Sequence, residues 1–210
     1  MGLSVEDTRA LLIAVADSVV AAKDMLTEAD SAIGDGDHGI GMAVGFEAAR
    51  KEIEGKEFAD VGAVWKAAGM GIMKTSGGAC GAVFSTLFRA AGKSLGAAET
   101  METPALAAAL AEAVDAIKAR GGANLGDKTM LDALAPAADA LAAQGDAPLP
   151  AALAAAADAA DAGVEATKQM VAKTGKARPL GERSLGHADP GAVSTAVIFR
   201  AMRDHLAGRG

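Results

Sequence analysis

Apolar side chains recur along this chain at the three- and four-residue spacing of an α-helix rather than at the alternating spacing of a β-strand. Alanine, the strongest helix former, dominates the sequence, while tyrosine is absent and aromatic residues amount to 3%. The first segment shows the pattern in one apolar stripe, formed by Leu11, Leu12, Val15, Val19, Ala22 and Leu26. The pattern predicts an all-α fold.

Helix boundaries follow from capping and proline signals. Ser4 and Asp7 form a candidate capping box in front of the first helix. Seven further helices are predicted over residues 40–52, 58–73, 81–93, 104–120, 129–143, 149–171 and 190–206. Pro104 and Pro190 stand where a first helical turn tolerates proline, whereas Pro136 lies inside the sixth helix and should kink or split it.

Composition limits the function classes. The chain has 210 residues, 51% of them hydrophobic, and no break in composition, which predicts a single domain over residues 1–210. A net charge of -7 argues against nucleic acid as a partner. The single cysteine, Cys80, excludes an internal disulfide, and we find neither a leader sequence nor an apolar run that could span a membrane. We expect a cytoplasmic protein without a membrane partner.

Four connections combine glycine with polar or charged residues, which a simple turn would not need. They cover residues 30–41, 75–81, 121–129 and 175–191. In an antiparallel helical bundle with short connections, alternate loops share one end. We therefore expect several of these loops to meet at one rim and to carry the chemistry there.

The first of these loops is rich in aspartate. Asp30, Asp35 and Asp37 fall within eight residues, and the glycines between them allow the backbone to bring them together. Three carboxylates this close repel one another and favour a cation, and oxygen ligands suit Mg²⁺ or Ca²⁺. A solvated acidic turn is the alternative that the loop alone leaves open.

A calcium EF-hand does not fit the aspartate loop. With Asp35 in the first position, Ile40 stands where the glycine belongs and Phe46 where the bidentate glutamate belongs. His38 and the glycines at 39 and 41 lead into the next helix, whose first amides would face whatever the metal holds, and this suggests a phosphate. We treat His38 as a contact residue and not as a catalytic base.

The other three loops repeat the theme. Residues 75–81, Thr-Ser-Gly-Gly-Ala-Cys-Gly, lack a Walker lysine, and their glycines suit either close helix packing or the approach of a phosphate to backbone amides. Cys80 is either a thiol activated by the helix terminus or, as we favour, a small packing residue. In residues 126–130, Gly-Asp-Lys-Thr-Met, the methionine suits a flat ring, whereas N-capping by Asp127 is the structural alternative. Residues 180–191 place Glu, Arg, Ser, His and Asp among glycines.

Taken in order, these four motifs resemble those of the L subunit of dihydroxyacetone kinases, over essentially the whole chain. The resemblance implies an eight-helix antiparallel up-and-down barrel with a nucleotide site at one end. It also implies two Mg²⁺ ions bridging the phosphates of ADP or ATP to Asp30, Asp35 and Asp37. The positions that the resemblance assigns to the nucleotide are His38, Gly39, Ile40, Gly41, Gly78, Ala79, Cys80, Gly121, Thr129, Met130, Lys176, Arg178, Asp189, Pro190 and Gly191.

The implied function is that of a phosphotransferase subunit. It would transfer a phosphoryl group to a small ketose held by a separate K-type subunit, for which this chain has no room. Charge neutralisation by the metal ions and positioning of the phosphate would drive the transfer, so that no general base is needed. In one branch of the family, ADP stays bound and an M protein of the phosphotransferase system rephosphorylates it, whereas in the other ATP exchanges. The sequence is also compatible with a homodimer.

Three departures from the family pattern should affect the affinity for the nucleotide. Cys80 stands where serine is frequent, Lys176 stands where an adenine-side arginine is frequent with Arg178 close by, and Gly41 replaces a frequent asparagine. Two other functions remain as alternatives. One is a related kinase acting on a four-carbon ketose or a fatty acid, and the other is a non-catalytic, ADP-responsive module that signals to a regulator.

Overall fold

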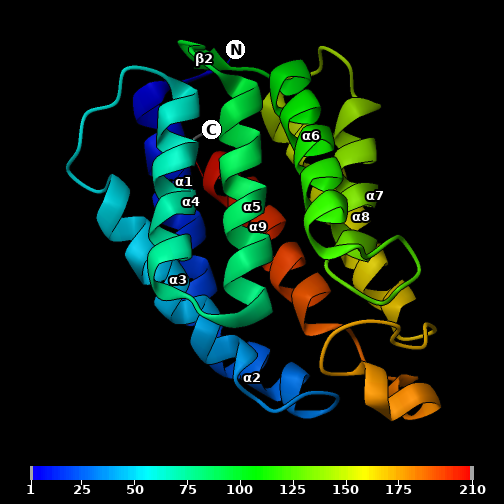
Figure 1. The fold of residues 1–210 in the computed structure, drawn as a ribbon. Helices are drawn as coiled ribbons and strands as arrows, with labels where there is room; N and C mark the ends of the chain where they lie inside the picture. Colours follow the sequence, from blue (N-terminus) through cyan, green and yellow to red (C-terminus); the bar gives the residue numbers. More distant parts are fainter. Residues whose placement is uncertain (1, 209–210) are drawn as a thin grey trace.

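The structure, a computed structural model, describes residues 2–208 and confirms the all-α fold (Figure 1). The α-helices are α1 (Val5–Ala21), α2 (Lys23–Ser31), α3 (His38–Ile53), α4 (Val61–Thr75), α5 (Gly78–Leu95), α6 (Thr103–Gly121), α7 (Leu131–Ala142), α8 (Leu149–Thr167) and α9 (Pro190–Ala207). A 3-10 helix, η1 (Arg178–Ser184), lies between α8 and α9. Two short strands, β1 (Leu3–Ser4) and β2 (Thr100–Met101), pair antiparallel.

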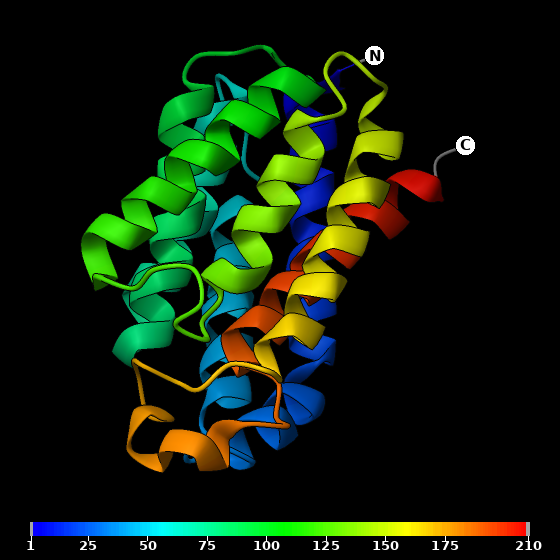
Figure 2. The same ribbon diagram turned by 90° about the vertical axis from the view of Figure 1, so that its right-hand side faces the viewer.

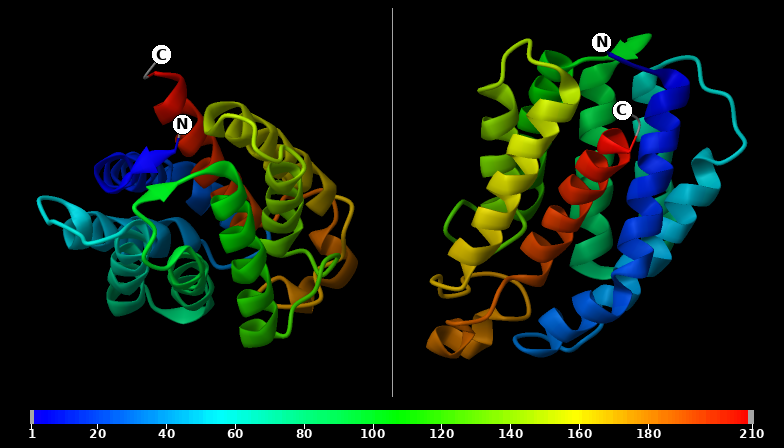
Figure 3. Two further views of the ribbon diagram at one scale, coloured as in Figure 1. Left: turned by 90° about the horizontal axis from the view of Figure 1, so that it is seen from above. Right: turned by 180° about the vertical axis from the view of Figure 1, so that it is seen from behind.

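Eight of the α-helices close into a ring. From α3 to α9 each helix packs on the next in the chain, α1 packs on α3, and α9 returns to α1. Figure 2 shows the helices standing side by side, and Figure 3 shows the ring from above. The expected eight-helix barrel is therefore confirmed, with α2 as an additional helix that packs on α3 and α9 at one end of the barrel.

Four of the six aromatic residues, Phe46, Trp65, Phe84 and Phe88, gather in the core between α3, α4 and α5. Trp65 and Phe88 lie 5.3 Å apart between ring centroids, and Phe46 meets Phe88 edge-on at 5.6 Å. All three side chains are fully buried. Elsewhere the helices bring alanines together, and small side chains let helix backbones approach closely. An alanine-rich sequence with few aromatics therefore closes a barrel of closely packed helices.

The N-terminal helix begins as predicted but does not run through the whole stripe. Ser4 and Asp7 form the predicted capping box. The apolar stripe to Leu26 is divided at Ala22 into α1 and α2. The stripe therefore continues over two helices, because a break at Ala22 keeps the apolar residues of both pieces on the same core.

The C-terminal end of α8 and the middle of α7 also differ from expectation. Helix α8 ends at Thr167 rather than at residue 171, because the backbone carbonyls of residues 167 and 168 accept hydrogen bonds from Lys128 and from the amide of Gly186. Pro136 lies inside α7, which continues without a break, so the expected split does not occur. Along residues 2–208 no helix combines the length and apolarity needed to cross a bilayer.

Candidate functional site

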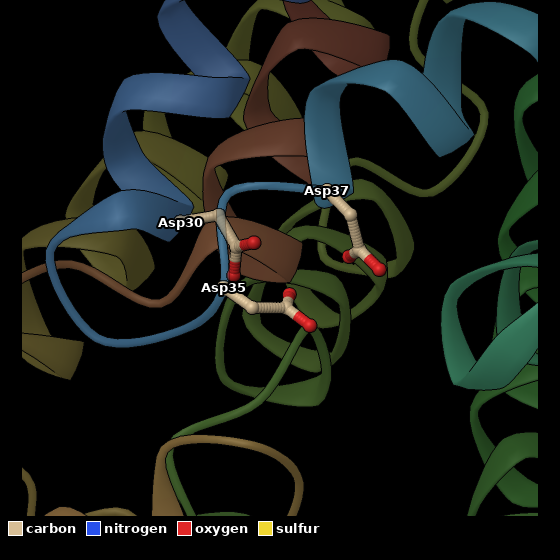
Figure 4. A group of neighbouring side chains, drawn as sticks. All are labelled: Asp30, Asp35 and Asp37. Atoms are coloured by element: carbon tan, nitrogen blue, oxygen red, sulfur yellow. The ribbon is translucent and has the colours of Figure 1, made fainter.

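The three aspartates of the first loop come together at the end of the barrel where α2 meets α3 (Figure 4). One carboxylate oxygen from each of Asp30, Asp35 and Asp37 lies within 4.8 Å of the others. Glycine makes this possible at two places. A Cβ on residue 34 would collide with the Asp30 carboxylate, and Gly36 has a φ of 76°, which side-chain-bearing residues rarely adopt.

A cationic side chain already lies on this acidic cluster. Lys176 donates to both carboxylate oxygens of Asp35 at 2.7 and 2.6 Å and to Asp37 at 2.7 Å. The hydrogen bonds from Lys176 lower the pKa of Asp35 below its usual value, and the same contacts raise the pKa of Lys176. Asp30 is buried, whereas Asp35 and Asp37 are exposed. Asp35 therefore favours its ionised form, and the three carboxylates together offer the oxygen donors that a hard divalent cation requires.

His38 holds a fixed position beside the acidic cluster. Its ring Nε2 is hydrogen-bonded to Ser194 Oγ on α9 at 2.7 Å, and its backbone N–H donates to Asp30 at 3.3 Å. Burial lowers the pKa of His38, against the opposing effect of Asp30 and Asp37. Because Ser194 already engages Nε2, the ring is held in one orientation beside the cluster, which suits positioning of a ligand.

A cavity of about 340 Å³ opens beside the cluster, within the size range of small-molecule sites. All four glycine-containing loops contribute to it, so the expectation that they meet at one rim is met. The predicted site residues that line it are Asp30, Asp37, His38, Gly78, Ala79, Cys80, Gly121, Thr129, Met130, Lys176, Asp189, Pro190 and Gly191.

Five predicted site residues do not line the cavity, and four of them have other surroundings. Gly39 packs against α2, where a Cβ would collide with the Lys23 carbonyl and with Thr27. Ile40 is 55% exposed. The Gly41 carbonyl accepts a hydrogen bond from Ser76, and Arg178 begins η1. The fifth, Asp35, belongs to the acidic cluster itself.

The second loop places the first amides of α5 beside the cavity. Gly78 has a φ of 70°, and a Cβ on residue 81 would collide with the Ser76 carbonyl, so glycine shapes the turn at both positions. Ser76 Oγ donates to the Gly41 carbonyl at 3.1 Å and thereby joins this turn to α3. The uncompensated N–H groups at the start of a helix attract anions.

Cys80 is a packing residue rather than a reactive thiol. Burial raises its pKa to about 12, with a smaller contribution from Asp37 and Asp30. Its Sγ lies 3.1 Å from Met42 Sδ. A thiol with so high a pKa remains protonated at neutral pH, and this argues against the nucleophile interpretation.

Asp127 does not cap α7, so that structural alternative was wrong. It accepts from the Asn124 amide at 2.7 Å and pairs with Lys173 at 3.2 Å. Asp132 stabilises the loop before α7 instead, because its carboxylate accepts hydrogen bonds from the backbone amides of Gly126 at 2.5 Å and Thr129 at 2.8 Å. The first turn of the helix thus folds back onto the preceding loop.

Sequence reasoning missed Lys128 and the apolar part of the lining. Lys128 is 2% exposed and lies at the cavity, although a lysine between aspartate and threonine is typical of a solvated turn. The apolar lining residues that were missed include Val83, Phe84, Ile117, Ala123 and Leu131. Most of them continue the core stripes of their helices, so periodicity alone does not separate them from the core.

Comparison with known proteins agrees with these features. A family model described as the DAK2 domain matches residues 32–204. The chain is 38% identical over 180 residues to the "PEP-dependent dihydroxyacetone kinase 1, ADP-binding subunit DhaL" of Listeria innocua, covering 86% of both chains. It is 34% identical to the corresponding ADP-binding subunit of Escherichia coli, covering 85% of this chain and 86% of that one.

Longer relatives match over part of their length. The chain is 40% identical over 196 residues to the D-erythrulose kinase of Mycolicibacterium smegmatis, covering 91% of this chain but 34% of that one. The crystal structure of the dihydroxyacetone kinase from C. freundii in complex with AMP-PNP and Mg²⁺ matches with a TM-score of 0.72 and 31% identity, over 94% of this chain and 33% of that chain. By sequence, fold and motif order, this chain belongs to the dihydroxyacetone kinase L-subunit family, which is built on the DAK2 domain.

Proposed function

We propose that this chain binds ADP or ATP together with Mg²⁺ and is the nucleotide-binding subunit of a kinase. The observation that carries the proposal is the acidic cluster of Asp30, Asp35 and Asp37, which opens onto the cavity of about 340 Å³. The acceptor would be a small ketose held by a separate K-type subunit. The relatives named as ADP-binding subunits, which this chain matches over most of their length, support the assignment.

The acidic cluster has the donors and spacing for Mg²⁺. Mg²⁺ takes oxygen ligands at about 2.0–2.1 Å, so oxygens that share one ion lie about 3–4 Å apart. The cluster atoms, all within 4.8 Å of one another, need only small side-chain rotations to reach that spacing. The Lys176 ammonium, held by Asp35 and Asp37, is a stand-in cation at the same oxygens. We propose that two ions bind here. They would share carboxylates, or phosphate and water oxygens would complete the coordination of each ion.

The cavity divides by chemistry into a phosphate side and a base side. Asp30 and Asp37 from the first loop and the α5 amides near Ala79 form the phosphate side. Ile117, Met130 and Leu131 provide an apolar surface at the ends of α6 and α7, which suits a flat purine ring. Bound Mg²⁺ would neutralise charge on the phosphates during transfer.

No residue of the cavity needs to act as a general base. His38 is half-buried, and its ring Nε2 is already hydrogen-bonded to Ser194 Oγ. In phosphoryl transfer most of the catalytic effect comes from positioning and electrostatics. The contribution of this chain would therefore be to orient the donor phosphate towards an acceptor on its partner.

The acceptor and the phosphate source are the open parts of the proposal. Dihydroxyacetone is the first candidate, since the ADP-binding subunits that match are named for it. A four-carbon ketose is the second, because a D-erythrulose kinase is 40% identical. The Listeria and E. coli relatives are named PEP-dependent, and this supports a branch in which an M protein of the phosphotransferase system rephosphorylates retained ADP.

Replacing the cluster aspartates tests the nucleotide proposal. We expect Asp30→Asn, Asp35→Asn and Asp37→Asn to abolish Mg²⁺-dependent ADP binding in calorimetry while the fold persists, because carboxylates that repel one another are removed. Asp24→Asn is the matched control, since the side chain of Asp24 is 96% exposed and lies outside the cluster. Unchanged ADP affinity in the cluster variants would refute the proposal.

A second experiment separates the two branches. Purified protein is denatured by heat and the supernatant is analysed for ADP. Stoichiometric ADP supports the retained-nucleotide branch, whereas an empty site favours exchange with ATP. Reconstitution with a K-type subunit, assayed with dihydroxyacetone and with erythrulose, identifies the acceptor.

A further inference from the structure

Lys128 combines burial of a charge with an unfavourable backbone conformation. Its side chain is 2% exposed, although lysine is rarely buried. Its φ is 62°, and among residues 2–208 it is the one non-glycine residue with a positive φ. Backbone strain of this kind persists where the surrounding contacts fix it, and it gathers at ligand sites. The contacts of Lys128 are therefore informative.

The ammonium group of Lys128 joins three segments of the chain. It donates to the carbonyl of Thr167 and to the carbonyl of His187, both at 2.6 Å. Thr167 is the last residue of α8, where carbonyls lack a partner within the helix and carry the negative end of the helix dipole. His187 lies on the segment that leads into α9. One side chain thus connects the loop before α7, the end of α8 and the approach to α9.

Two neighbouring side chains complete this buried network. The hydroxyl of Thr167 accepts from the Asp189 amide at 3.0 Å and donates to the Val164 carbonyl at 2.6 Å. Asp132 accepts from backbone amides on both sides of Lys128. We refer to Lys128, Asp132 and Thr167 with these bonds as the Lys128 network. Removing one partner from such a network leaves buried polar groups without hydrogen bonds.

The Lys128 network lies directly behind one wall of the cavity. Thr129 and Met130 follow Lys128 in the chain, and Asp189 and Gly191 follow His187, and all four line the cavity. The two segments touch, since a Cβ on Gly191 would lie 3.2 Å from the Cβ of Met130. The acidic cluster arises from other elements, at the junction of α2 and α3. The Lys128 network thus lies against the Met130 side of the cavity, whereas the acidic cluster is carried by α2 and the loop between α2 and α3.

We propose that Lys128 is a positioning residue for the base side of the nucleotide, which holds the Met130 and Asp189 segments in register through Thr167 and His187. The inference rests on the proposed nucleotide-binding function and adds a specific division of labour to it. Binding of the base depends on the Lys128 network, whereas binding of Mg²⁺ and phosphate depends on the acidic cluster and the start of α5.

The test compares two probes, Mg²⁺–ADP and Mg²⁺–pyrophosphate, by calorimetry on the full-length chain. Lys128→Met removes the ammonium but keeps the length of the side chain. Thr167→Val keeps the shape of Thr167 and removes the hydroxyl that holds Asp189, while Thr167→Ser keeps the hydroxyl and is the matched control. Because lost hydrogen bonds loosen the wall, we expect Lys128→Met and Thr167→Val to raise the Kd for ADP about tenfold. The Kd for pyrophosphate should remain close to that of the parent chain, and Thr167→Ser should retain both affinities.

The outcomes separate the positioning role of Lys128 from the proposed nucleotide-binding function. If the variants weaken both probes equally, or neither, the positioning role is wrong. If Lys128→Met does not fold, the comparison of Thr167→Val with Thr167→Ser decides alone. If the unmodified chain binds pyrophosphate and ADP with the same affinity, the base side does not exist, although the metal–phosphate part of the proposed function stands. If it binds neither probe, the proposed function itself fails, and the role of Lys128 fails with it.

Discussion

At the scale of single residues, Asp189 is the carboxyl group whose protonation should matter most for stability near neutral pH. It accepts from the Ala192 amide at 2.8 Å at the start of α9. Burial, with a smaller effect from Asp132, raises its pKa to about 7. A raised pKa means that the folded state binds the proton more tightly than the unfolded state does. The stabilisation is therefore present at acidic pH and is lost as the pH rises towards 7.

We expect Asp189→Asn to remove this pH dependence. Asparagine retains the helix cap without a titrating group, so the variant should gain stability relative to the parent between pH 4.5 and 7.5, by on the order of 2 kcal/mol. The measurement is the free energy of unfolding from denaturant titrations at several pH values. Parallel curves for the two proteins, or a gap that closes as pH rises, would contradict the assignment.

Lys176 should compete with a divalent cation for the acidic cluster. Its ammonium bonds to Asp35 and Asp37, so Mg²⁺ in the absence of nucleotide must displace it. Because exposed ion pairs are weak, we expect Lys176→Met to tighten binding of Mg²⁺ alone by only about two- to fivefold. Lys173→Met is the control, since Lys173 pairs with Asp127 outside the acidic cluster. Titration at low ionic strength measures the effect, and equal or weaker Mg²⁺ binding by Lys176→Met would rule out competition.

At the scale of helices, glycine sets how closely α3 and α4 approach. A Cβ on Gly71 would lie 2.7 Å from the backbone of Ala48 and Ala49. Backbone atoms cannot move aside as a flexible side chain can, so Gly71→Ala should separate the two helices. We expect a loss of about 1–3 kcal/mol in the free energy of unfolding.

The matched control for Gly71→Ala is Gly41→Ala on α3. There the nearest atom, Ser76 Oγ, would lie 3.8 Å from the new Cβ, and glycine inside a helix is itself unfavourable. We therefore expect Gly41→Ala to be neutral or stabilising by up to about 1 kcal/mol. Chemical denaturation of both variants checks the pair, and similar losses in both would show that the contact between α3 and α4 is not what Gly71 protects.

Sequence patterns that lie within a few residues of a helix end predicted that end well. Contacts between segments far apart in the sequence left no pattern from which they could be predicted. The capping box at Ser4 marked where α1 begins because both partners lie within one turn. The end of α8 at Thr167 depends on Lys128, 39 residues away, so the apolar pattern ran past it. For the same reason the acidic cluster was predicted, since its three aspartates are close in sequence, whereas the burial of Lys128 was not predicted.

At the scale of the whole molecule, ring closure explains how loops far apart in the sequence form one site. The ring of eight helices places the segments around residues 30–41, 75–81, 121–130 and 174–191 at the same end of the barrel. The opposite end carries the β1–β2 pair and the turns between α3 and α4, α5 and α6, and α7 and α8. Site and strand pair are thus separated by the length of the helices.

This separation predicts where a ligand will change hydrogen exchange. Mg²⁺–ADP at about 100 times its Kd would stabilise the folded chain by about 2.7 kcal/mol. Local opening, which governs loop exchange, should be suppressed in all four site segments together, because each contributes to the same cavity. The turns at the opposite end should exchange at an unchanged rate. Exchange measured by mass spectrometry with and without Mg²⁺–ADP checks this. Protection confined to the aspartate loop and residues 75–81 would instead indicate binding of the metal and phosphates alone, with no part for the wall that Lys128 supports.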